Sequence, residues 1–403
     1  MTDGSSFRQL AARVPGARAL HDFVARYRRP PLLQHPLRRR RPRPTGVLMA
    51  DRAASAEDVV IATRLLAAYQ ASVASARSTD ERSDIWTDIQ AGQKHFLSIL
   101  HGADPEVLAS YLCNMSRHDA MRGISQGDIE FARISRDRSY LDFVALVTQD
   151  KLVSLAESVG ALPIESPEQG TYGANLHHDP ARLVAGIEAR LELDITPPDI
   201  DGGLLKLQAG KRAFSERDLS AVYSAHLLQN VTPATGEARI CEIGGGAGRL
   251  AYWSHRLGMK AYTIVDLPHV NVVQGYYLLK TLPPDSVLLY GEDRSTSLHA
   301  GLRILPAHAI SDDHAHEYDV VVNQDSFPEM DAATVRDYLS WIKTCCRGWL
   351  MSINQENKPP YGNGRLHVSV PETIQELGGF RLRQRFPYWL RKGYVMELYE
   401  LVD

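Results

Sequence analysis

Apolar residues along the chain follow two different patterns. From residue 53 to about residue 162 they recur every three or four positions, most clearly over 56–76, 106–115 and 140–160. This spacing is typical of amphipathic helices. Residues 163–208 contain more proline and glycine, which favour turns. The first part of the chain is therefore predicted to be an all-α domain, followed by a turn-rich connection.

From residue 209 onward, short apolar runs alternate with helical patterns. Strands are expected at 240–243, 261–265, 302–305, 318–323, 349–353, 380–386 and 394–401. Helices are expected at 214–228, 247–257, 268–282, 332–345 and 371–377. Residues 286–290 are a further strand candidate, but 302–305 is preferred as the third strand because it lies nearer the fourth. The alternation predicts a parallel sheet with helices on both faces, closed by an antiparallel hairpin.

The predicted fold class is α/β, with an all-α domain at residues 51–208 and a Rossmann-like domain at 209–403. The Rossmann-like domain should contain a seven-stranded, mostly parallel sheet whose last strand is antiparallel. Residues 1–50 differ from both, since 26–43 contain eight arginines and no acidic residue. A basic arm or a targeting peptide are alternatives for this segment. A disordered extension is the simpler interpretation, and Met49 leaves open a true start just after it.

A glycine loop follows the first strand of the predicted sheet. Gly244, Gly245, Gly246 and Gly248 come directly after residues 240–243. Residues without a Cβ let the backbone turn sharply while a ligand lies against it. Asp266 ends the second strand, where a carboxylate can accept hydrogen bonds from ribose hydroxyls. The combination predicts a nucleoside-cofactor site.

The spacing of this loop narrows the choice of cofactor. A dinucleotide fingerprint needs a glycine where Arg249 stands, and a P-loop needs a Gly-Lys-Ser/Thr ending that is missing here. The remaining pattern, E-x-G-x-G-x-G from Glu242 to Gly248, resembles the first motif of class I methyltransferases that use S-adenosylmethionine (SAM). This resemblance implies that the amino-acid end of SAM lies over the glycine loop and that its ribose reaches Asp266.

Composition excludes several function classes. The formal net charge of −3 gives no general affinity for nucleic acid. No apolar run reaches the length of about 18 residues that a membrane span needs. The four cysteines include no C-x-x-C pair, which disfavours a disulfide framework or a structural zinc and suits a cytoplasmic protein.

Methyl transfer to a weakly acidic hydroxyl needs a base or a metal to remove the proton. Ligands of doubly wound sheets bind at the carboxyl ends of the strands, so residues 323–329 should face the reacting groups. The candidate bases are Asp325, Glu329, Glu356 and His367. His367 has the most suitable intrinsic pKa, but Asp325 and Glu329 are better placed by topology.

No metal is predicted. Metal-assisted methyltransferases of the catechol type present a carboxylate after the fourth strand and an Asp-Asn pair after the fifth. The matching positions here are Asn323 and Asn354-Gln355. Magnesium sites rely on carboxylates rather than on amides alone.

The chain resembles the bacterial sugar O-methyltransferases linked to natural-product glycoside tailoring. The segments that carry the resemblance are 155–170 (LAESVGALPIESPEQG), 221–225 (AVYSA), 242–251 (EIGGGAGRLA), 266–268 (DLP), 323–330 (NQDSFPEM) and 354–356 (NQE). The resemblance implies a SAM-dependent O-methyltransferase that acts on a hydroxyl of a sugar or glycoside. The first fifty residues lie outside it, and Ala247 stands where family members often have an aromatic residue.

The complete set of expected site residues falls into three groups. Those expected at the cofactor are Glu242, Gly244, Gly246, Gly248, Asp266, Leu267, His308, Asn323 and Tyr223. Those expected at the acceptor are Ser326, Asn354, Glu356 and Tyr361, and the catalytic candidates are Asp325, Glu329 and His367. The alternatives are a methyltransferase acting on nitrogen or on a phenolic or polyketide oxygen, and a catalytically silent SAM-binding protein. The expected partner is a small molecule, neither nucleic acid nor membrane, and a homo-oligomer stays open.

Overall fold

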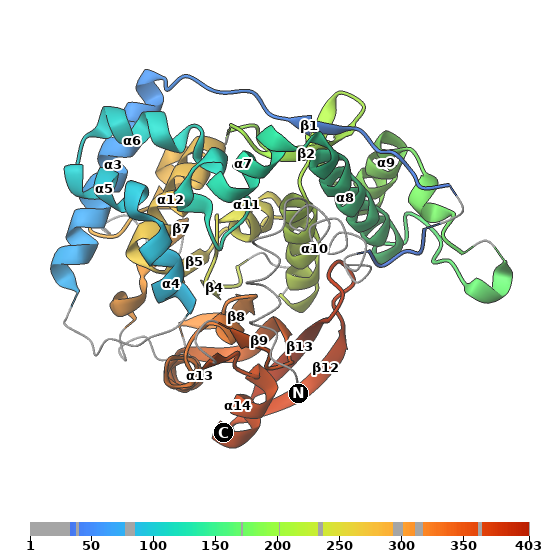
Figure 1. Cartoon of the computed structure of the whole chain (residues 1–403). Helices are drawn as coiled ribbons and strands as arrows, with labels where there is room; N and C mark the ends of the chain where they lie inside the picture. Colours follow the sequence, from blue (N-terminus) through green and yellow to red (C-terminus); the bar gives the residue numbers. More distant parts are fainter. Residues whose placement is uncertain are drawn as a thin grey trace, which may run out of the picture.

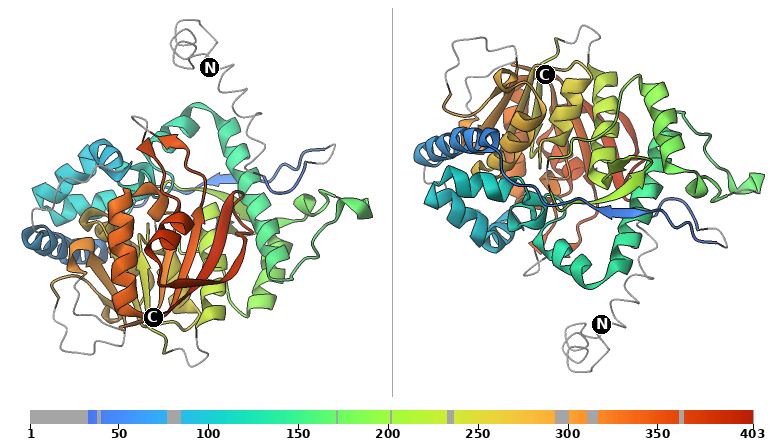
Figure 2. Two further views of the ribbon diagram at one scale, coloured as in Figure 1. Left: turned by 90° about the horizontal axis from the view of Figure 1, so that it is seen from below. Right: turned by 90° about the horizontal axis from the view of Figure 1, so that it is seen from above.

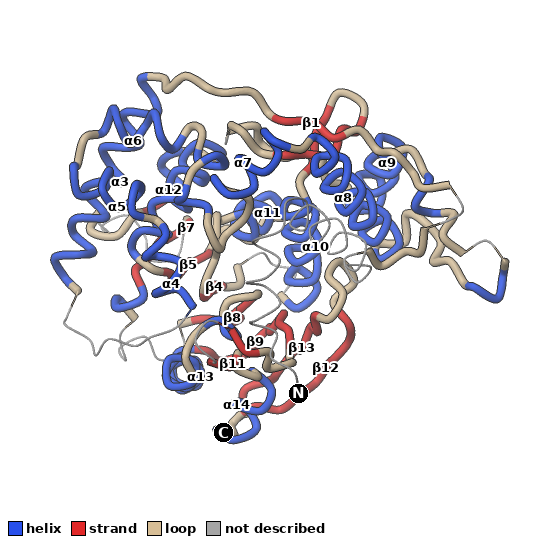
Figure 3. Tube along the Cα trace, viewed as in Figure 1, coloured by secondary structure: helices blue, strands red, loops and turns tan. Residues whose placement is uncertain are grey.

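The computed structural model describes residues 33–37, 40–76, 85–170, 172–200, 202–232, 237–292, 301–310, 317–361 and 365–402. Its central element is an eight-stranded sheet in the order β12-β13-β9-β8-β4-β5-β7-β6 (Figures 1 and 3). The strands are β4 (Ile240–Ile243), β5 (Tyr262–Asp266), β6 (Val287–Leu288), β7 (Leu302–Pro306), β8 (Tyr318–Gln324), β9 (Cys346–Gln355), β12 (Phe380–Pro387) and β13 (Tyr394–Leu401).

The pairing of these strands confirms the predicted Rossmann-like layout. Strands β6, β7, β5, β4, β8 and β9 run parallel to one another. Strand β13 is antiparallel to both β9 and β12. The choice of 302–305 as the third strand is correct. The two-residue edge strand β6, within the candidate run 286–290, makes the sheet eight-stranded instead of seven-stranded.

Alternate residues of the strands pack on opposite faces of the sheet, as the two-residue period requires. In β4, Ile240 belongs to one hydrophobic cluster, while Cys241 and Ile243 belong to another. The first cluster includes residues of α10 (Glu216–Val231), α11 (Arg249–Arg256) and α12 (Pro268–Thr281). The second includes residues of α13 (Ala332–Cys345) and α14 (Val370–Leu377). Helices therefore cover both faces.

The helical region packs directly on this sheet domain. Its helices are α3 (Ala56–Ser75), α4 (Ile85–Gly92), α5 (Lys94–Gly102), α6 (Pro105–Leu112), α7 (Asp128–Arg136), α8 (Arg138–Ser158) and α9 (Pro180–Leu191). Helix α3 lies beside α12, and α8 lies beside α10 (Figures 1 and 2). One continuous hydrophobic cluster contains residues from both parts, so the two share a core.

Short elements complete the chain. The 3₁₀ turns are η2 (Met115–Arg117), η3 (Asp119–Met121), η4 (Pro167–Gln169), η5 (Asn175–His177), η6 (Pro284–Ser286), η7 (Ala307–Ala309) and η8 (Phe327–Glu329). Strands β10 (Pro360–Tyr361) and β11 (Arg365–Leu366) form a small antiparallel pair. None of the described helices is both long and apolar enough to cross a membrane.

A second sheet corrects the prediction of an all-α N-terminal domain. Strands β1 (Gly46–Leu48), β2 (Leu205–Ala209) and β3 (Arg212–Phe214) form three antiparallel strands, and β2 is the central one. The expected boundary between residues 208 and 209 therefore falls inside β2. The sequence carries little signal for this sheet because β1 and β2 are short and far apart along the chain.

The expectation of a disordered extension at residues 1–50 is also wrong for the part that the structure describes. Strand β1 is paired along its whole length. His35 is buried, with 8% of its surface exposed. Residues 1–32 and 38–39, which include five of the eight arginines of 26–43, lie outside the described residues.

Helix α10, which contributes to the cavity described below, begins with a capping box. The Ser215 hydroxyl accepts a hydrogen bond from the backbone N–H of Asp218 at 3.2 Å, and the Asp218 carboxylate accepts one from the backbone N–H of Ser215 at 3.2 Å. We expect Ser215→Ala to lower the free energy of unfolding by about 0.5–2 kcal/mol. Urea denaturation measures this change, and exposed Ser110→Ala in α6 is the control, with an expected change within about 0.5 kcal/mol.

Candidate functional site

A cavity of about 510 Å³ lies at the carboxyl ends of β4, β5 and β8. Eight of the residues expected at the site line it: Glu242, Gly244, Gly246, Asp266, Leu267, Asp325, Ser326 and Glu329. The volume is in the usual range for small-molecule sites. The structure therefore brings the glycine loop, the acidic end of β5 and two candidate bases to one cavity.

The glycines of the loop serve different purposes. Gly244 has φ +76°, and a Cβ there would lie 2.2 Å from Ser326 Oγ, so the loop packs directly on the segment after β8. Gly246 has φ +55°, but the nearest atom to an added Cβ is 3.6 Å away, on Ile124. Gly246 faces the cavity, which leaves room for a ligand close to the backbone. Gly248, with φ +80°, is the N-cap of α11 and packs on Leu278 outside the cavity lining.

Asp266 lines the cavity with a hydrogen-bonded carboxylate. One oxygen accepts from the backbone N–H of Leu267 at 2.8 Å, and the other accepts from Gln274 Nε2 at 2.7 Å. Burial raises the pKa of Asp266 to about 6, against the lowering effect of these hydrogen bonds. The backbone N–H groups of Gly245 and Gly246 also act on this carboxylate and lower its pKa, so a ligand donor would share Asp266 with the glycine loop.

Glu242 lies at the base of the cavity. It accepts a hydrogen bond from the Tyr262 hydroxyl at 3.0 Å. Burial raises the pKa of Glu242 to about 8, although that hydrogen bond acts in the opposite direction. A cationic ligand group nearby would favour the ionised carboxylate.

Arg249, at the position where a dinucleotide fingerprint has glycine, is used to join two helices. Its Nε lies 3.1 Å from a carboxylate oxygen of Asp218, and both side chains are buried. Its guanidinium also lies 5.3 Å from the centre of the Tyr277 ring. Arg249 in α11 is thereby fixed to the first turn of α10.

Asp325 adopts a left-handed backbone conformation, with φ +67°. Its N–H donates to the carbonyl of Ile353 at 3.0 Å and to Asn354 Oδ1 at 2.9 Å. Non-glycine residues rarely adopt this conformation outside turns and functional sites. The strand end of β9 therefore holds the Asp325 backbone in place.

Two arginines and a tyrosine surround the Asp325 carboxylate. Arg391 and the Tyr394 hydroxyl donate to its two oxygens, and Arg217 Nη1 lies 3.5 Å from one of them. Burial favours the neutral acid, but Arg391 and Arg217 outweigh it and hold the pKa of Asp325 below its ordinary value. A carboxylate stabilised in this way is a poor proton acceptor near neutral pH.

Glu329, in η8, has the opposite environment. Burial and the negative charge of Asp325 raise the pKa of Glu329 to about 8, and the more distant effects of Arg391 and Arg217 only reduce this shift. A general base works best when its pKa is near the operating pH. Of the candidate bases, Glu329 is therefore the one whose environment suits proton removal.

Asn323, Ser326 and Asn354 form the support behind these two acids. Asn323 Nδ2 donates to the carbonyl of Ile243 at 3.0 Å and to Ser326 Oγ at 2.5 Å. Asn354 Nδ2 donates to Asn323 Oδ1 at 2.9 Å. Asn323 and Asn354 are both buried and do not line the cavity, whereas Ser326 does.

Several expected site residues lie elsewhere. Tyr223 is buried with its ring 5.2 Å from that of Tyr388, and His308 bonds Ser75 Oγ at 3.0 Å through Nε2. Glu356 pairs with Arg385 at 2.7 Å. His367 Nδ1 bonds the carbonyl of Pro328 at 3.0 Å. None of these four lines the cavity, and the side chain of Tyr361 lies outside the part that the structure describes.

The sequence did not identify the part of the cavity that the helical region supplies. Trp86, Thr87 and Gln90 of α4 line it, and so do Gly123 and Ile124. Helix α10 adds Arg217, Ser220 and Ala221, and Tyr338 of α13 lies at the lining as well. The sequence suggests a role for α10 at the site only because the predicted helix 214–228 lies next to the first strand in the chain. No local pattern in the sequence marks the residues of α4 as part of a cavity.

The described residues contain no group of three or more His, Cys, Asp or Glu side chains arranged to hold a metal ion. The four cysteines are all buried as free thiols. The site that the described residues form is therefore one of carboxylates, arginines, amides and aromatic rings.

No protein-family model matches the chain, and no curated protein matches it. Magnesium protoporphyrin IX methyltransferase from Synechocystis, solved with bound SAM, is 12% identical, with 46% of this chain and 82% of that one covered and a TM-score of 0.33. Mitomycin 7-O-methyltransferase is 13% identical, with 67% and 99% covered and a TM-score of 0.34. The 1,6-didemethyltoxoflavin-N1-methyltransferase of Burkholderia thailandensis is 19% identical, with 46% and 79% covered and a TM-score of 0.30.

Proposed function

We propose that the chain is a SAM-dependent O-methyltransferase whose cavity holds both the methyl donor and a small-molecule acceptor. The observation that carries the proposal is that the glycine loop, Asp266 and Glu329 line one cavity of about 510 Å³. This arrangement combines a nucleoside-binding loop with a base of suitable pKa. A silent binding protein would have no physical need for the second feature.

The residues of the loop fit the donor. Gly246 leaves the backbone open to the cavity, and the Asp266 carboxylate lines the same cavity, where it can accept from ribose hydroxyls. Glu242, whose pKa is raised to about 8 by burial, would be ionised by the ammonium of an amino-acid moiety. SAM supplies a methyl group on an electrophilic sulfonium.

The chain's own contribution to the reaction is positioning and proton removal. Glu329 accepts the proton of the acceptor hydroxyl, and Asp325 stays ionised and helps to keep the pKa of Glu329 raised. Trp86, Thr87 and Gln90 of α4 add to the walls of the cavity. Alignment of two bound groups supplies a large part of the rate of such displacements.

A hydroxyl of a sugar or glycoside is the proposed acceptor class. It is supported by the resemblance of segments 242–251, 323–330 and 354–356 to the sugar O-methyltransferases. The side of the cavity near Glu329 adds polar acceptors and an aromatic ring, from Asp325, Gln90 and Trp86. A sugar hydroxyl, with its high pKa, also has the greatest need of the base that Glu329 provides.

Two measurements test the proposal. Calorimetry with S-adenosylhomocysteine should detect binding, and no detectable binding would rule out the donor site. Mass spectrometry after incubation with SAM and a panel of glycosides, phenols and amines should find a mass increase of one methylene group in a glycoside. Methylation of phenols or amines alone would replace the sugar assignment while leaving the methyltransferase intact.

A further inference from the structure

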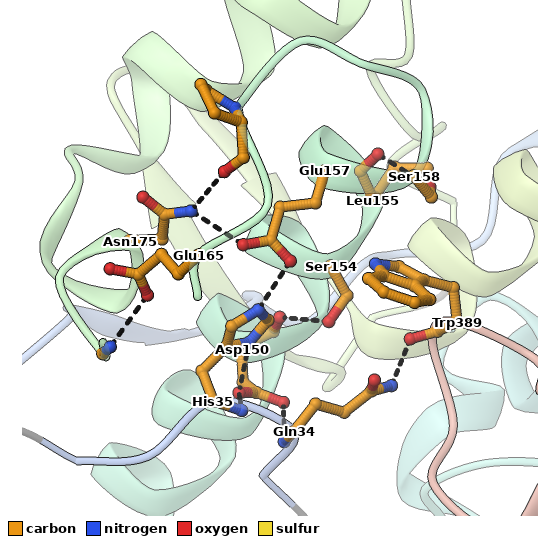
Figure 4. A network of polar contacts seen from close by, with 12 residues as sticks. Gln34, His35, Asp150, Ser154, Leu155, Glu157, Ser158, Glu165, Asn175 and Trp389 are labelled. Atoms are coloured by element: carbon orange, nitrogen blue, oxygen red, sulfur yellow. Dashed lines mark hydrogen bonds and ion pairs between the residues drawn. The ribbon is translucent and has the colours of Figure 1, made fainter. Parts of the chain in front are cut away.

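Two residues of the arginine-rich segment 26–43, Gln34 and His35, belong to a buried polar cluster that the proposed reaction does not use. Gln34 and His35 lie against α8 and against the turn between β12 and β13 (Figure 4). His35 is 8% exposed, Asp150 is fully buried, and Glu157 is 5% exposed. Buried polar groups of this kind are costly unless each has its partner, so the cluster is a specific attachment.

The attachment to α8 uses both residues. The backbone N–H groups of Gln34 and His35 donate to the two oxygens of Asp150, each at 2.8 Å. The His35 ring bridges two carboxylates, with Nδ1 2.9 Å from Asp150 and Nε2 2.8 Å from Glu157. Asn175 Nδ2 donates to the other oxygen of Glu157 at 2.7 Å. Both oxygens of Asp150, both oxygens of Glu157 and both ring nitrogens of His35 thereby have a partner.

The His35 ring is charged in this setting. Burial lowers its pKa, but the hydrogen bonds to Asp150 and Glu157 outweigh burial and raise it to about 9. Those two carboxyl groups, both on α8, are the acidic groups that contact the ring. Because the folded pKa is higher than the ordinary value of 6.5, the stabilisation is complete below about pH 6.5 and is lost as the pH rises through about 9.

The same segment reaches the turn between β12 and β13. Gln34 Nε2 donates to the carbonyl of Trp389, two residues before Arg391. Arg391 contacts the Asp325 carboxylate. The Tyr388 hydroxyl, in the same turn, bonds the carbonyl of Ser220 at 3.0 Å, and Ser220 lines the cavity.

A second route leads from α8 to the same carboxylate. Lys151 follows Asp150 in the chain, and its Nζ lies 3.3 Å from Glu216 Oε2. Arg217, the next residue of α10, lies 3.5 Å from Asp325. Both arginines that hold Asp325 thus come from elements that contact α8 or Gln34.

We propose that Gln34 and His35 form a buckle that positions the reacting end of the cavity. The buckle fixes α8 to the turn of residues 388–393, and this turn holds Arg391 on Asp325 beside Glu329. Gln34 and His35 are positioning residues, because neither lines the cavity. The effect on Glu329 rests on the proposed function, whereas the attachment itself can be tested without an acceptor.

Hydrogen exchange of the full-length chain, read by mass spectrometry, tests the buckle. In His35→Ala and Gln34→Ala, backbone amides of residues 388–394 should exchange roughly 10-fold faster or more, while those of residues 240–256 stay unchanged. Arg41→Ala, an exposed change in the same segment, is the matched control and should leave both regions unchanged. Equal acceleration throughout the chain, or none at residues 388–394, would overturn the proposal.

Gln34→Ala keeps the test decisive if His35→Ala does not fold, because it retains the ion pairs of His35. Affinity for S-adenosylhomocysteine should stay within about two-fold in Gln34→Ala, since Gln34 does not line the cavity. The pH–rate profile should move to higher pH, because Arg391 lowers the pKa of Glu329. A profile that stays in place while residues 388–394 exchange faster would overturn the positioning role. Failure of the parent chain to bind S-adenosylhomocysteine would instead count against the proposed function.

Discussion

Replacing Glu329 by glutamine is expected to lower kcat for methyl transfer by about 10²- to 10⁴-fold, the usual contribution of a general base. The amide has nearly the same shape but cannot accept the proton of the acceptor hydroxyl. Calorimetry should find little change in affinity for S-adenosylhomocysteine, because Glu329 is not part of the glycine loop or of β5. Steady-state kinetics with the acceptor found in the glycoside panel measures the loss.

The raised pKa of Glu329 also predicts the direction in which the rate of methyl transfer changes with pH. Glu329 must be ionised to act as a base, so the rate should rise with pH through about 8, the raised pKa of this side chain, and then level off. Asp325→Asn removes a charge that raises this pKa, and the rise should move to lower pH. Glu356→Gln is the matched control, because Glu356 pairs with Arg385 outside the cavity. A Glu329→Gln variant with near-normal kcat would exclude Glu329 as the base.

Replacing Asp266 by alanine is expected to weaken binding of SAM and S-adenosylhomocysteine by roughly 10- to 100-fold, because hydrogen bonds to a charged acceptor contribute about 1.5–3 kcal/mol. The ribose hydroxyls would lose their acceptor, and Gln274 would lose one partner. Affinity in the parent chain should fall as the pH drops through about 6, the pKa to which burial raises Asp266, since hydroxyl donors favour the ionised carboxylate. Calorimetry at several pH values measures both effects.

Asp266→Asn is the matched variant for this change. It keeps the size of the side chain and one acceptor oxygen, so its loss of affinity should be smaller than that of Asp266→Ala and nearly independent of pH around 6. Equal affinity in the parent chain and in Asp266→Ala would remove Asp266 from the ribose site.

The sheet domain could be predicted well because its signals are local. Short apolar runs mark buried parallel strands, and residues after them gather at one edge of the sheet. For this reason the sequence alone predicts that Gly246, Asp266 and Glu329 lie at the same site. The two-residue strand β6 was the exception, since an edge pair needs little apolar sequence.

The choice among Asp325, Glu329 and His367 could not be made from the sequence. It depends on Arg391 and Arg217, which lie far from residue 325 along the chain and hold the carboxylate of Asp325. The ordinary pKa of a histidine side chain favours His367 as the base. In the structure, however, its ring makes a hydrogen bond with the carbonyl of Pro328, and His367 does not line the cavity. Contacts between residues this far apart along the chain produce no periodic pattern in the sequence.

The strand pairing of β1 with β2 has a consequence for synthesis of the chain. Residues 46–48 leave the ribosome early, but their partner at 205–207 follows only after the whole helical region. Chain elongation adds about 5–20 residues per second, so the early segment waits roughly 8–30 seconds for its partner. During that interval residues 46–48 are unpaired and open to proteases and chaperones. Folding of the first half is completed only when the second half begins to emerge.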